Sequence, residues 1–155
     1  MKIAVLLATF NRREKTLACL ESLYKQIFTE GTSFDVFLTD DSSSDGTPEA
    51  VKSSFPSVNI FRGSGSLFWA GGMRNSWREA LKTNPEYYLL LNDDTVLNPL
   101  AIYKLLSYNQ KHSNDAEAIC IGTTADVSSG KITYGGHRLY SQKNEKSFYI
   151  FIKNE

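Results

Sequence analysis

Three polar clusters carry the residue types that could bind a charged ligand, and each follows an apolar run typical of a buried strand. They are Thr9, Asn11 and Arg12; Asp40 and Asp41; and Asn92, Asp93 and Asp94. In an open α/β sheet, ligands bind outside the carboxyl ends of the strands, so the topology would bring all three clusters to one edge. Their joint placement, more than any single cluster, predicts a ligand-binding site.

The acidic cluster at residues 92–94 predicts a site for a divalent cation. Adjacent carboxylates repel each other unless a cation lies between them. Hard oxygen ligands suit Mg²⁺ or Mn²⁺, which bind one or two carboxylates together with substrate phosphates. Such an ion would neutralise a nucleoside-diphosphate leaving group. The alternative is an exposed acidic turn before the helix that begins at Asn98-Pro99.

The stretch from Asp40 to Thr47 is the most specific of the polar segments. An aspartate at a strand end can accept a hydrogen bond from a pyrimidine imide or a ribose hydroxyl. Asp45-Gly46-Thr47 predicts a turn into a helix, with Thr47 as its cap and Pro48 in its first turn. The alternative is a well-capped acidic loop with no ligand.

A glycine-rich stretch at residues 62–72 is expected to be a loop, with a helix after it. Glycines allow close backbone approach, and a helix N-terminus favours anions, so Arg74 is a candidate phosphate contact. The alternative for Arg74 is an ordinary surface arginine. Trp69 is either a platform on the substrate side or a core residue.

The elements that must position these residues alternate between strands and helices. Strands are predicted at residues 3–9, 34–39, 58–61, 87–91 and 118–121, with helical spacing between them. This rhythm predicts an α/β fold with a mostly parallel central sheet flanked by helices. After residue 122 the pattern changes to short β-segments at residues 131–134 and 148–152.

Length and composition agree with one soluble domain. The 155 residues include 17 basic and 17 acidic side chains, so no basic surplus points to a nucleic-acid partner. Cys19 and Cys120 lack metal-ligand spacing and are expected to be free thiols, as in a reducing cytoplasm. No segment approaches the ~18 apolar residues of a membrane span.

Four stretches in chain order resemble the motifs of family 2 glycosyltransferases, especially the bacterial rhamnosyltransferase-like members. Residues 8–12 (ATFNR) resemble TYNR, and residues 40–47 (DDSSSDGT) are similar to DDxSxDGT. Residues 71–75 (GGMRN) resemble the RN helix start, and residues 91–95 (LNDDT) resemble LNNDT, a form of the DXD metal motif. The resemblance covers most of residues 1–122 and implies a GT-A fold, a Rossmann-like nucleotide-diphospho-sugar transferase domain.

The resemblance implies a role for each matching residue. Nucleotide contacts would come from Thr9, Asn11, Arg12, Asp40, Asp41, Arg74 and Asp93. Among these, Asp40 would bind the base. Asp94 would hold Mn²⁺ or Mg²⁺, with Asn92 at the first DXD position. Two departures stand out: Asn92 is a neutral, weaker ligand, and Trp77 replaces a glycine that often follows the RN pair.

The resemblance also implies an activity, a hexosyltransferase type of reaction. A sugar would move from a nucleotide-diphosphate donor, a dTDP- or UDP-sugar, to a glycan or lipid-linked acceptor. The transfer would be inverting and metal-assisted. Its setting would be bacterial cell-surface polysaccharide synthesis in the cytoplasm, with peripheral association at the inner face of the membrane.

The catalytic base of the family lies further along, in an acidic ED-type motif that has no convincing match before Glu155. Neither Asp126 nor Glu145 is assigned that role, so the catalytic residue is unknown and the chain is expected to be truncated at its C-terminus. One GT-A-type domain is expected over residues 1–155. Residues 1–122 would form the nucleotide-sugar-binding part and residues 123–155 the start of the acceptor-side part.

Two other functions compete with transfer. A module that binds a nucleotide sugar without transferring it agrees with the missing base. A phosphoacceptor signalling domain would need its acid pair after the first strand, where this chain has Thr9-Phe10-Asn11. The absence of GxGxxG, GxxxxGK[ST] and GxSxG patterns removes support from dinucleotide-binding, P-loop and hydrolase functions.

Overall fold

The computed structural model describes residues 1–112, 119–126, 128–134, 137–139 and 149–151. The chain forms two compact units, Met1–Leu100 and Ala101–Glu155, and each is described by itself. The expected functional boundary at residue 122 stays a prediction. None of the helices in the described ranges is long and apolar enough to cross a membrane.

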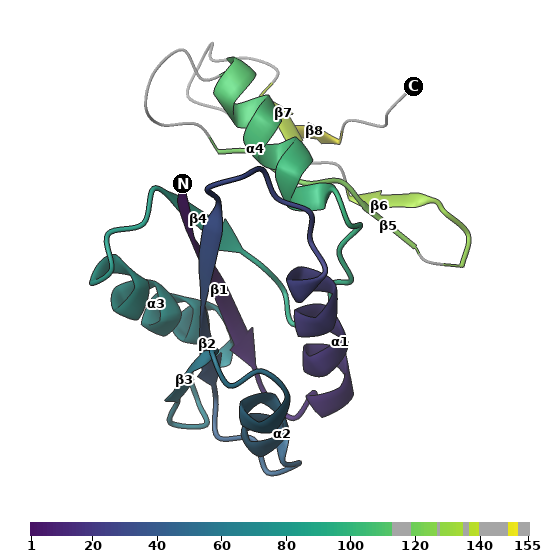
Figure 1. Ribbon diagram of the computed structural model, residues 1–155. Coiled ribbons are helices and arrows are strands. Elements are labelled where there is room, and N and C mark those ends of the chain that lie inside the picture. The colour runs from purple at the N-terminus through teal and green to yellow at the C-terminus, as the bar shows by residue number, and fades with distance from the viewer. Residues whose placement is uncertain (113–118, 127, 135–136, 140–148, 152–155) are drawn as a thin grey trace, which may run out of the picture. The chain divides into compact units, whose positions relative to one another are not determined.

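The first unit alternates strands and helices along the chain. They are β1 (Lys2–Thr9), α1 (Arg13–Tyr24), β2 (Ser33–Asp40), α2 (Thr47–Ser54), β3 (Asn59–Arg62), α3 (Phe68–Leu81) and β4 (Tyr87–Leu90). The strands form one sheet in the order β3-β2-β1-β4, and every pairing in it is parallel (Figure 1). The predicted parallel sheet flanked by helices is confirmed.

The central strand β1 is buried on both faces, which explains its continuous apolar sequence. Side chains alternate across a strand, so Ala4 and Leu6 point to one face, where they pack with Met73 and Ala80 of α3. Ile3, Val5 and Leu7 are buried on the opposite face, which α1 and α2 cover (Figure 1). Each buried Leu, Ile or Val side chain stabilises the fold by roughly 1.5–3 kcal/mol.

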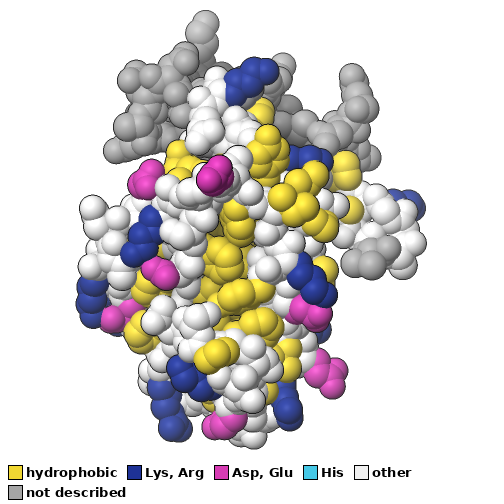
Figure 2. All heavy atoms as spheres, viewed as in Figure 1, with side chains coloured by type: hydrophobic (Ala, Val, Ile, Leu, Met, Phe, Trp, Pro, Cys, Tyr) yellow, Lys and Arg dark blue, Asp and Glu magenta, His cyan; other side chains and the backbone are white. Residues whose placement is uncertain are grey.

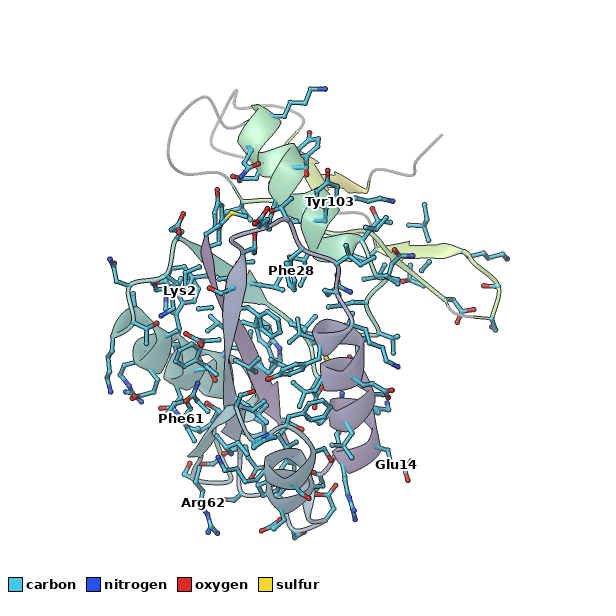
Figure 3. All side chains as sticks on the ribbon, in the orientation of Figure 1. Lys2, Glu14, Phe28, Phe61, Arg62 and Tyr103 are labelled. Atoms are coloured by element: carbon cyan, nitrogen blue, oxygen red, sulfur yellow. The ribbon has the colours of Figure 1, made fainter. Side chains whose placement is uncertain are left out.

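An aromatic cluster holds the end of α1 against the start of β2. The Tyr24 ring lies 5.2 Å from Phe34 and 5.1 Å from Phe55, and the Phe28 and Phe34 rings are 5.4 Å apart. Figure 2 shows hydrophobic side chains gathered on the face of the protein turned toward the viewer. In Figure 3, Phe28 lies toward one end of the unit and Arg62, the last residue of β3, at the other. The cluster therefore stabilises the end of the sheet away from the strands' carboxyl ends.

Helix α3 starts earlier than predicted. The expected loop at residues 62–72 is wrong for its last part, because α3 begins at Phe68 and contains Gly71 and Gly72. The amide groups at the helix start are capped by Asp41, which lies far away in the sequence. Gly72 packs so closely on β1 that a Cβ atom there would lie 2.6 Å from the Cβ of Ala8. A glycine is thus required inside this helix for packing rather than for a loop.

The second unit contains one helix and short antiparallel pairs within the described ranges. They are α4 (Ala101–His112), β5 (Thr124–Ala125) with β6 (Ile132–Tyr134), and β7 (His137–Leu139) with β8 (Tyr149–Phe151). The predicted segments at 131–134 and 148–152 agree with β6 and β8, although residues 148 and 152 lie outside the described residues.

The strand predicted at residues 118–121 is wrong where the structure describes it. Residues 119–121 belong to no strand, and residue 118 lies outside the described residues. Ile119 is 93% exposed and Ile121 is 52% exposed. A short apolar run predicts a strand only if a partner strand pairs with it, and here the pairing begins later, at β5.

Candidate functional site

The parallel register brings the three polar clusters to one edge of the sheet, as the sequence predicted. Thr9, at the end of β1, pairs with Asp40, at the end of β2, and Leu6 pairs with Leu90, the last residue of β4. The loops that follow β1, β2 and β4 therefore leave the sheet side by side. Figure 3 labels Glu14, in the first turn of α1, and Arg62 at this end of the unit.

Arg12 joins the loop after β1 to the acidic loop after β4. Its guanidinium Nη1 donates to Oδ1 of Asp93 at 3.2 Å and to Oδ2 of Asp94 at 2.9 Å. The Asp93 side chain is 9% exposed and that of Asp94 is 40% exposed. A cationic group thus already lies between the two carboxylates, which offsets their mutual repulsion.

A cavity of about 370 Å³ opens beside this ion-pair network. It is lined by Arg12, Trp69, Asn92, Asp93 and Asp94. The indole Nε1–H of Trp69 donates to Oδ1 of Asn92 at 3.0 Å, so the start of α3 is tied to the acidic loop. One wall of the cavity carries Arg12 and two carboxylates and another is aromatic, so an anionic ligand would need a cation beside the carboxylates, while its apolar part could contact the ring.

Asp40 is the other chemically conspicuous residue of this edge. It is 3% exposed, and its Oδ2 accepts a hydrogen bond from the Ser43 amide at 3.0 Å. Among the described residues, its Oδ1 is the buried side-chain oxygen that has no hydrogen-bond partner. A buried acceptor without a partner costs about 1–3 kcal/mol, so a ligand donor at this atom would relieve that cost.

Asp41, the neighbour of Asp40, has both carboxylate oxygens occupied by the backbone. Oδ1 accepts from the Gly65 amide at 2.7 Å, and Oδ2 accepts from the amides of Leu67 at 2.8 Å and Phe68 at 3.1 Å. A Cβ atom on Gly63 would lie 2.4 Å from Asp41 Oδ1, so only glycine fits there. Asp41 organises the approach to α3, and its predicted contact with the nucleotide stays a prediction.

Asn11 and Asp45 lock the loops after β1 and β2. Asn11 has a φ of 51°, and its Oδ1 accepts from the Ser44 amide at 2.8 Å. The backbone N–H of Asn11 in turn donates to Ser43 Oγ at 2.8 Å. Asp45 accepts from the Thr47 amide at 3.0 Å and from its hydroxyl at 2.5 Å, and this hydroxyl lowers the pKa of Asp45. Both side chains position the loop backbone that surrounds Asp40.

Thr9 and Arg74 differ in how far they are available to a ligand. Thr9 is buried, and its hydroxyl shares a hydrogen bond of 2.9 Å with the hydroxyl of Thr16. Arg74 is exposed on α3. The nucleotide contacts expected of both residues stay predictions.

The thiol of Cys19 lies under the acidic loop after β4 and forms a hydrogen bond with its backbone. Cys19 of α1 is fully buried, and its S–H donates to the carbonyl oxygen of Asn92 at 3.3 Å. Burial, reinforced by the negative charge of Asp93, raises the pKa of Cys19 to about 12. The side chain therefore stays a neutral thiol at physiological pH and keeps its proton for this hydrogen bond.

Asp126, in the second unit, is accounted for by a turn. Its Oδ1 accepts from the amides of Ser128 at 3.1 Å and Ser129 at 2.8 Å, and from both hydroxyls. These hydrogen bonds, with the Ser128 hydroxyl first, lower the pKa of Asp126 to about 2. A carboxylate stabilised in this way is a poor general base near neutral pH.

The acidic loop fits a divalent cation that binds together with phosphates. Within the described ranges, no group of three or more His, Cys, Asp or Glu side chains is placed to hold a metal ion. Asp93 and Asp94 nevertheless supply two carboxylates beside a cavity, although one oxygen of each accepts a hydrogen bond from Arg12, which a metal ion would have to displace. Mg²⁺ and Mn²⁺ sites of this kind are completed by ligand phosphates and water.

A parallel sheet with helices on both faces defines an α/β unit of the doubly wound class, in which ligands bind outside the carboxyl ends of the strands. The family model described as "Glycosyl transferase family 2" matches residues 4–154, and the chain belongs to this family. Comparison with curated protein sequences finds no match.

Two solved structures illustrate the shared GT-A fold. Mannosyltransferase PcManGT from Pyrobaculum calidifontis, in complex with GDP-Man and Mn²⁺, has a TM-score of 0.60 at 18% identity, and the match covers 69% of this chain and 32% of that one. S. aureus TarS 1-349, in complex with UDP-GlcNAc, has a TM-score of 0.61 at 23% identity, and the match covers 72% of this chain and 32% of that one. The chain thus spans about a third of the length of these structures.

Proposed function

We propose that this chain forms the donor site of a glycosyltransferase that moves a sugar from a nucleotide-diphosphate sugar to a glycan or lipid-linked acceptor. The transfer would be inverting and would serve cell-surface polysaccharide synthesis at the cytoplasmic face of the membrane. Family membership supports the reaction class. The bound GDP-Man and UDP-GlcNAc of the similar structures support a nucleotide-sugar donor.

The observation that carries this proposal is the unpartnered Oδ1 of Asp40 at the polar edge of the sheet. A buried carboxylate oxygen is stabilised when it accepts a hydrogen bond from an N–H or O–H group, and the imide N–H of a uracil or thymine base is such a donor. A base at Asp40 would direct its diphosphate along the same edge, toward Arg12 and the acidic loop. UDP- and dTDP-sugars are therefore the donors that we favour.

Asp94, with Asn92, would hold Mn²⁺ or Mg²⁺, and Asp93 would lie beside the nucleotide. When bound, the ion would stabilise the charge that develops on the diphosphate as the glycosidic bond breaks. Asp94 is the more exposed of the two carboxylates, so it is the one that the ion and the phosphates can reach together. Arg12 would be released from the carboxylates and could then donate to a phosphate oxygen.

Replacing Asp40 with asparagine tests the base contact. The amide would offer an NH₂ group where the carboxylate offers a free oxygen, and a hydrogen bond to a charged group is worth about 1.5–3 kcal/mol. We expect roughly tenfold or greater loss of affinity for UDP or dTDP in isothermal titration with Mn²⁺ present. Asp35→Asn is the matched control, because Asp35 lies on the same strand but pairs with Lys2 at the other end.

If Asp40→Asn and the unmodified chain bound UDP and dTDP with equal affinity, the proposed contact between Asp40 and the base would be wrong. If the unmodified chain bound none of UDP, dTDP and GDP, the donor-site proposal itself would be wrong. A loss that occurs equally in Asp35→Asn would indicate a general effect on folding.

Replacing Arg12 with methionine tests whether this side chain competes with the cation. The two hydrogen bonds from Nη1 occupy carboxylate oxygens that a metal ion needs. Arg12 is half-exposed, so its ion pairs are screened and together worth about 1 kcal/mol. We therefore expect about fivefold tighter Mn²⁺ binding in the absence of nucleotide, measured by electron paramagnetic resonance. Arg13→Met, at the neighbouring exposed position, should leave Mn²⁺ affinity unchanged.

A further inference from the structure

Trp69 is a partly exposed aromatic side chain at the border of the cavity beside the acidic loop. It is 55% exposed although it lies at the start of α3, and its ring lines the cavity beside the acidic loop. The hydrogen bond from Nε1 to Asn92 Oδ1 fixes the polar edge of the indole. The bond uses the donor at the ring edge and leaves the apolar face of the ring for contact with a ligand.

The backbone just before Trp69 is held in a conformation that non-glycine residues rarely adopt. Phe68 has a φ of 53°, in the left-handed region, and its amide donates to Asp41 Oδ2 at 3.1 Å. Its own side chain is 81% exposed, so burial of Phe68 does not explain the conformation. The Asp41 cap therefore fixes the turn from which Trp69 reaches the acidic loop.

Trp77, further along the same helix, shows how a purely structural tryptophan is packed here. Its ring stacks on Tyr88 at a centroid distance of 5.2 Å, and it is 39% exposed. Trp69 is more exposed than Trp77 and borders a cavity. Because Trp69 lines a cavity whereas Trp77 stacks on a neighbouring ring, Trp69 is the one of the two that is placed for contact with a ligand.

We infer that the indole face of Trp69 is the surface on which the sugar of the nucleotide-sugar donor stacks, which makes Trp69 a specificity-determining residue. This inference rests on the proposed function. With the diphosphate at the charged wall of Arg12, Asp93 and Asp94, the sugar bonded to it must lie within a few ångströms. The remaining lining of the cavity is Trp69 and Asn92, and the Asn92 side-chain oxygen already accepts from the indole. The C–H faces of a pyranose are apolar and pack well on aromatic rings.

The test compares binding of a nucleotide with and without its sugar. UDP, dTDP and GDP are titrated calorimetrically with Mn²⁺, alongside UDP-GlcNAc, dTDP-rhamnose and GDP-mannose, on the unmodified chain, Trp69→Leu and Trp69→Phe. We expect Trp69→Leu to lower affinity for the preferred nucleotide sugar about tenfold while its nucleoside diphosphate stays within about twofold. Trp69→Phe keeps an aromatic face, so its affinity for the nucleotide sugar should lie between that of the unmodified chain and that of Trp69→Leu.

A second readout follows the ring itself. Trp77→Phe preserves an aromatic ring against Tyr88 and leaves Trp69 as the remaining tryptophan of the chain. Trp69 emission in this variant should change on addition of the nucleotide sugar more than on addition of the nucleoside diphosphate.

Unaltered affinity for the nucleotide sugar in Trp69→Leu would overturn the inference. An equal loss of affinity for the nucleotide sugar and for the nucleoside diphosphate would also overturn it, because that result indicates stacking of the base on Trp69. Failure of the unmodified chain to bind any of the six ligands would instead overturn the proposed function.

Discussion

Replacing Asp94 with alanine is expected to remove the manganese-dependent part of nucleotide binding, with a loss of roughly 100-fold, or about 2.7 kcal/mol. The Asp94 side chain is 40% exposed, whereas that of Asp93 is 9% exposed, so Asp94 is the carboxylate that an ion and a diphosphate can reach together. The measurement is the shift in unfolding temperature caused by UDP, dTDP or GDP, with and without Mn²⁺, because ligand binding to the native state raises its apparent stability.

The design separates metal binding from folding. Asp94 pairs with Arg12 near the surface, and such a pair contributes about 0–1 kcal/mol, so Asp94→Ala should unfold at nearly the same temperature as the unmodified chain without ligand. Asp35→Ala removes a surface carboxylate that pairs with Lys2 away from the site, and it should keep the manganese-dependent shift. A full manganese-dependent shift in Asp94→Ala would contradict the assignment of the ion to Asp94 and would point to Asp93 instead.

The sheet could be predicted from the sequence because its signals are local. A continuous apolar run that ends in a polar cluster is typical of a parallel strand buried on both faces. β1 follows this pattern along its length, and β2 follows it in its buried second half. The convergence of Arg12 with Asp93 and Asp94 was also predictable, since parallel strands deliver their carboxyl ends to one edge.

The roles of neighbouring aspartates could not be separated in the same way. Asp40 and Asp41 are identical residues at adjacent positions, yet Asp40 keeps a buried oxygen without a partner and Asp41 caps the start of α3. The difference arises because the chain returns to Asp41 at Leu67 and Phe68, a tertiary contact that no local pattern encodes. The same contact explains why α3 begins at Phe68, inside the stretch predicted to be a loop.

Gly72→Ala is expected to lower the free energy of unfolding by about 1–3 kcal/mol, a large share of the ~5–15 kcal/mol of a typical domain. Alanine normally stabilises a helix by about 1 kcal/mol relative to glycine, so the expected sign is the opposite of helix propensity. The reason is the 2.6 Å separation between a Cβ atom at residue 72 and the Cβ of Ala8, which forces α3 away from β1. Urea unfolding measures the change, and a stabilised Gly72→Ala protein would contradict the close contact.

The rescue experiment is a swap of one methyl group across this contact. In the double variant Ala8→Gly with Gly72→Ala, the clash is removed, so we expect a favourable coupling energy of about 1–2 kcal/mol between the two sites. Gly71→Ala is the control on the same helix, because its Cβ would meet a side-chain atom of Leu67 at 3.0 Å rather than β1. A shift of α3 away from β1 would also lengthen the hydrogen bond between Trp69 Nε1 and Asn92 Oδ1. Gly72→Ala should therefore alter Trp69 emission, and the double variant should restore it. Packing at Gly72 would thereby set the position of the aromatic wall of the site.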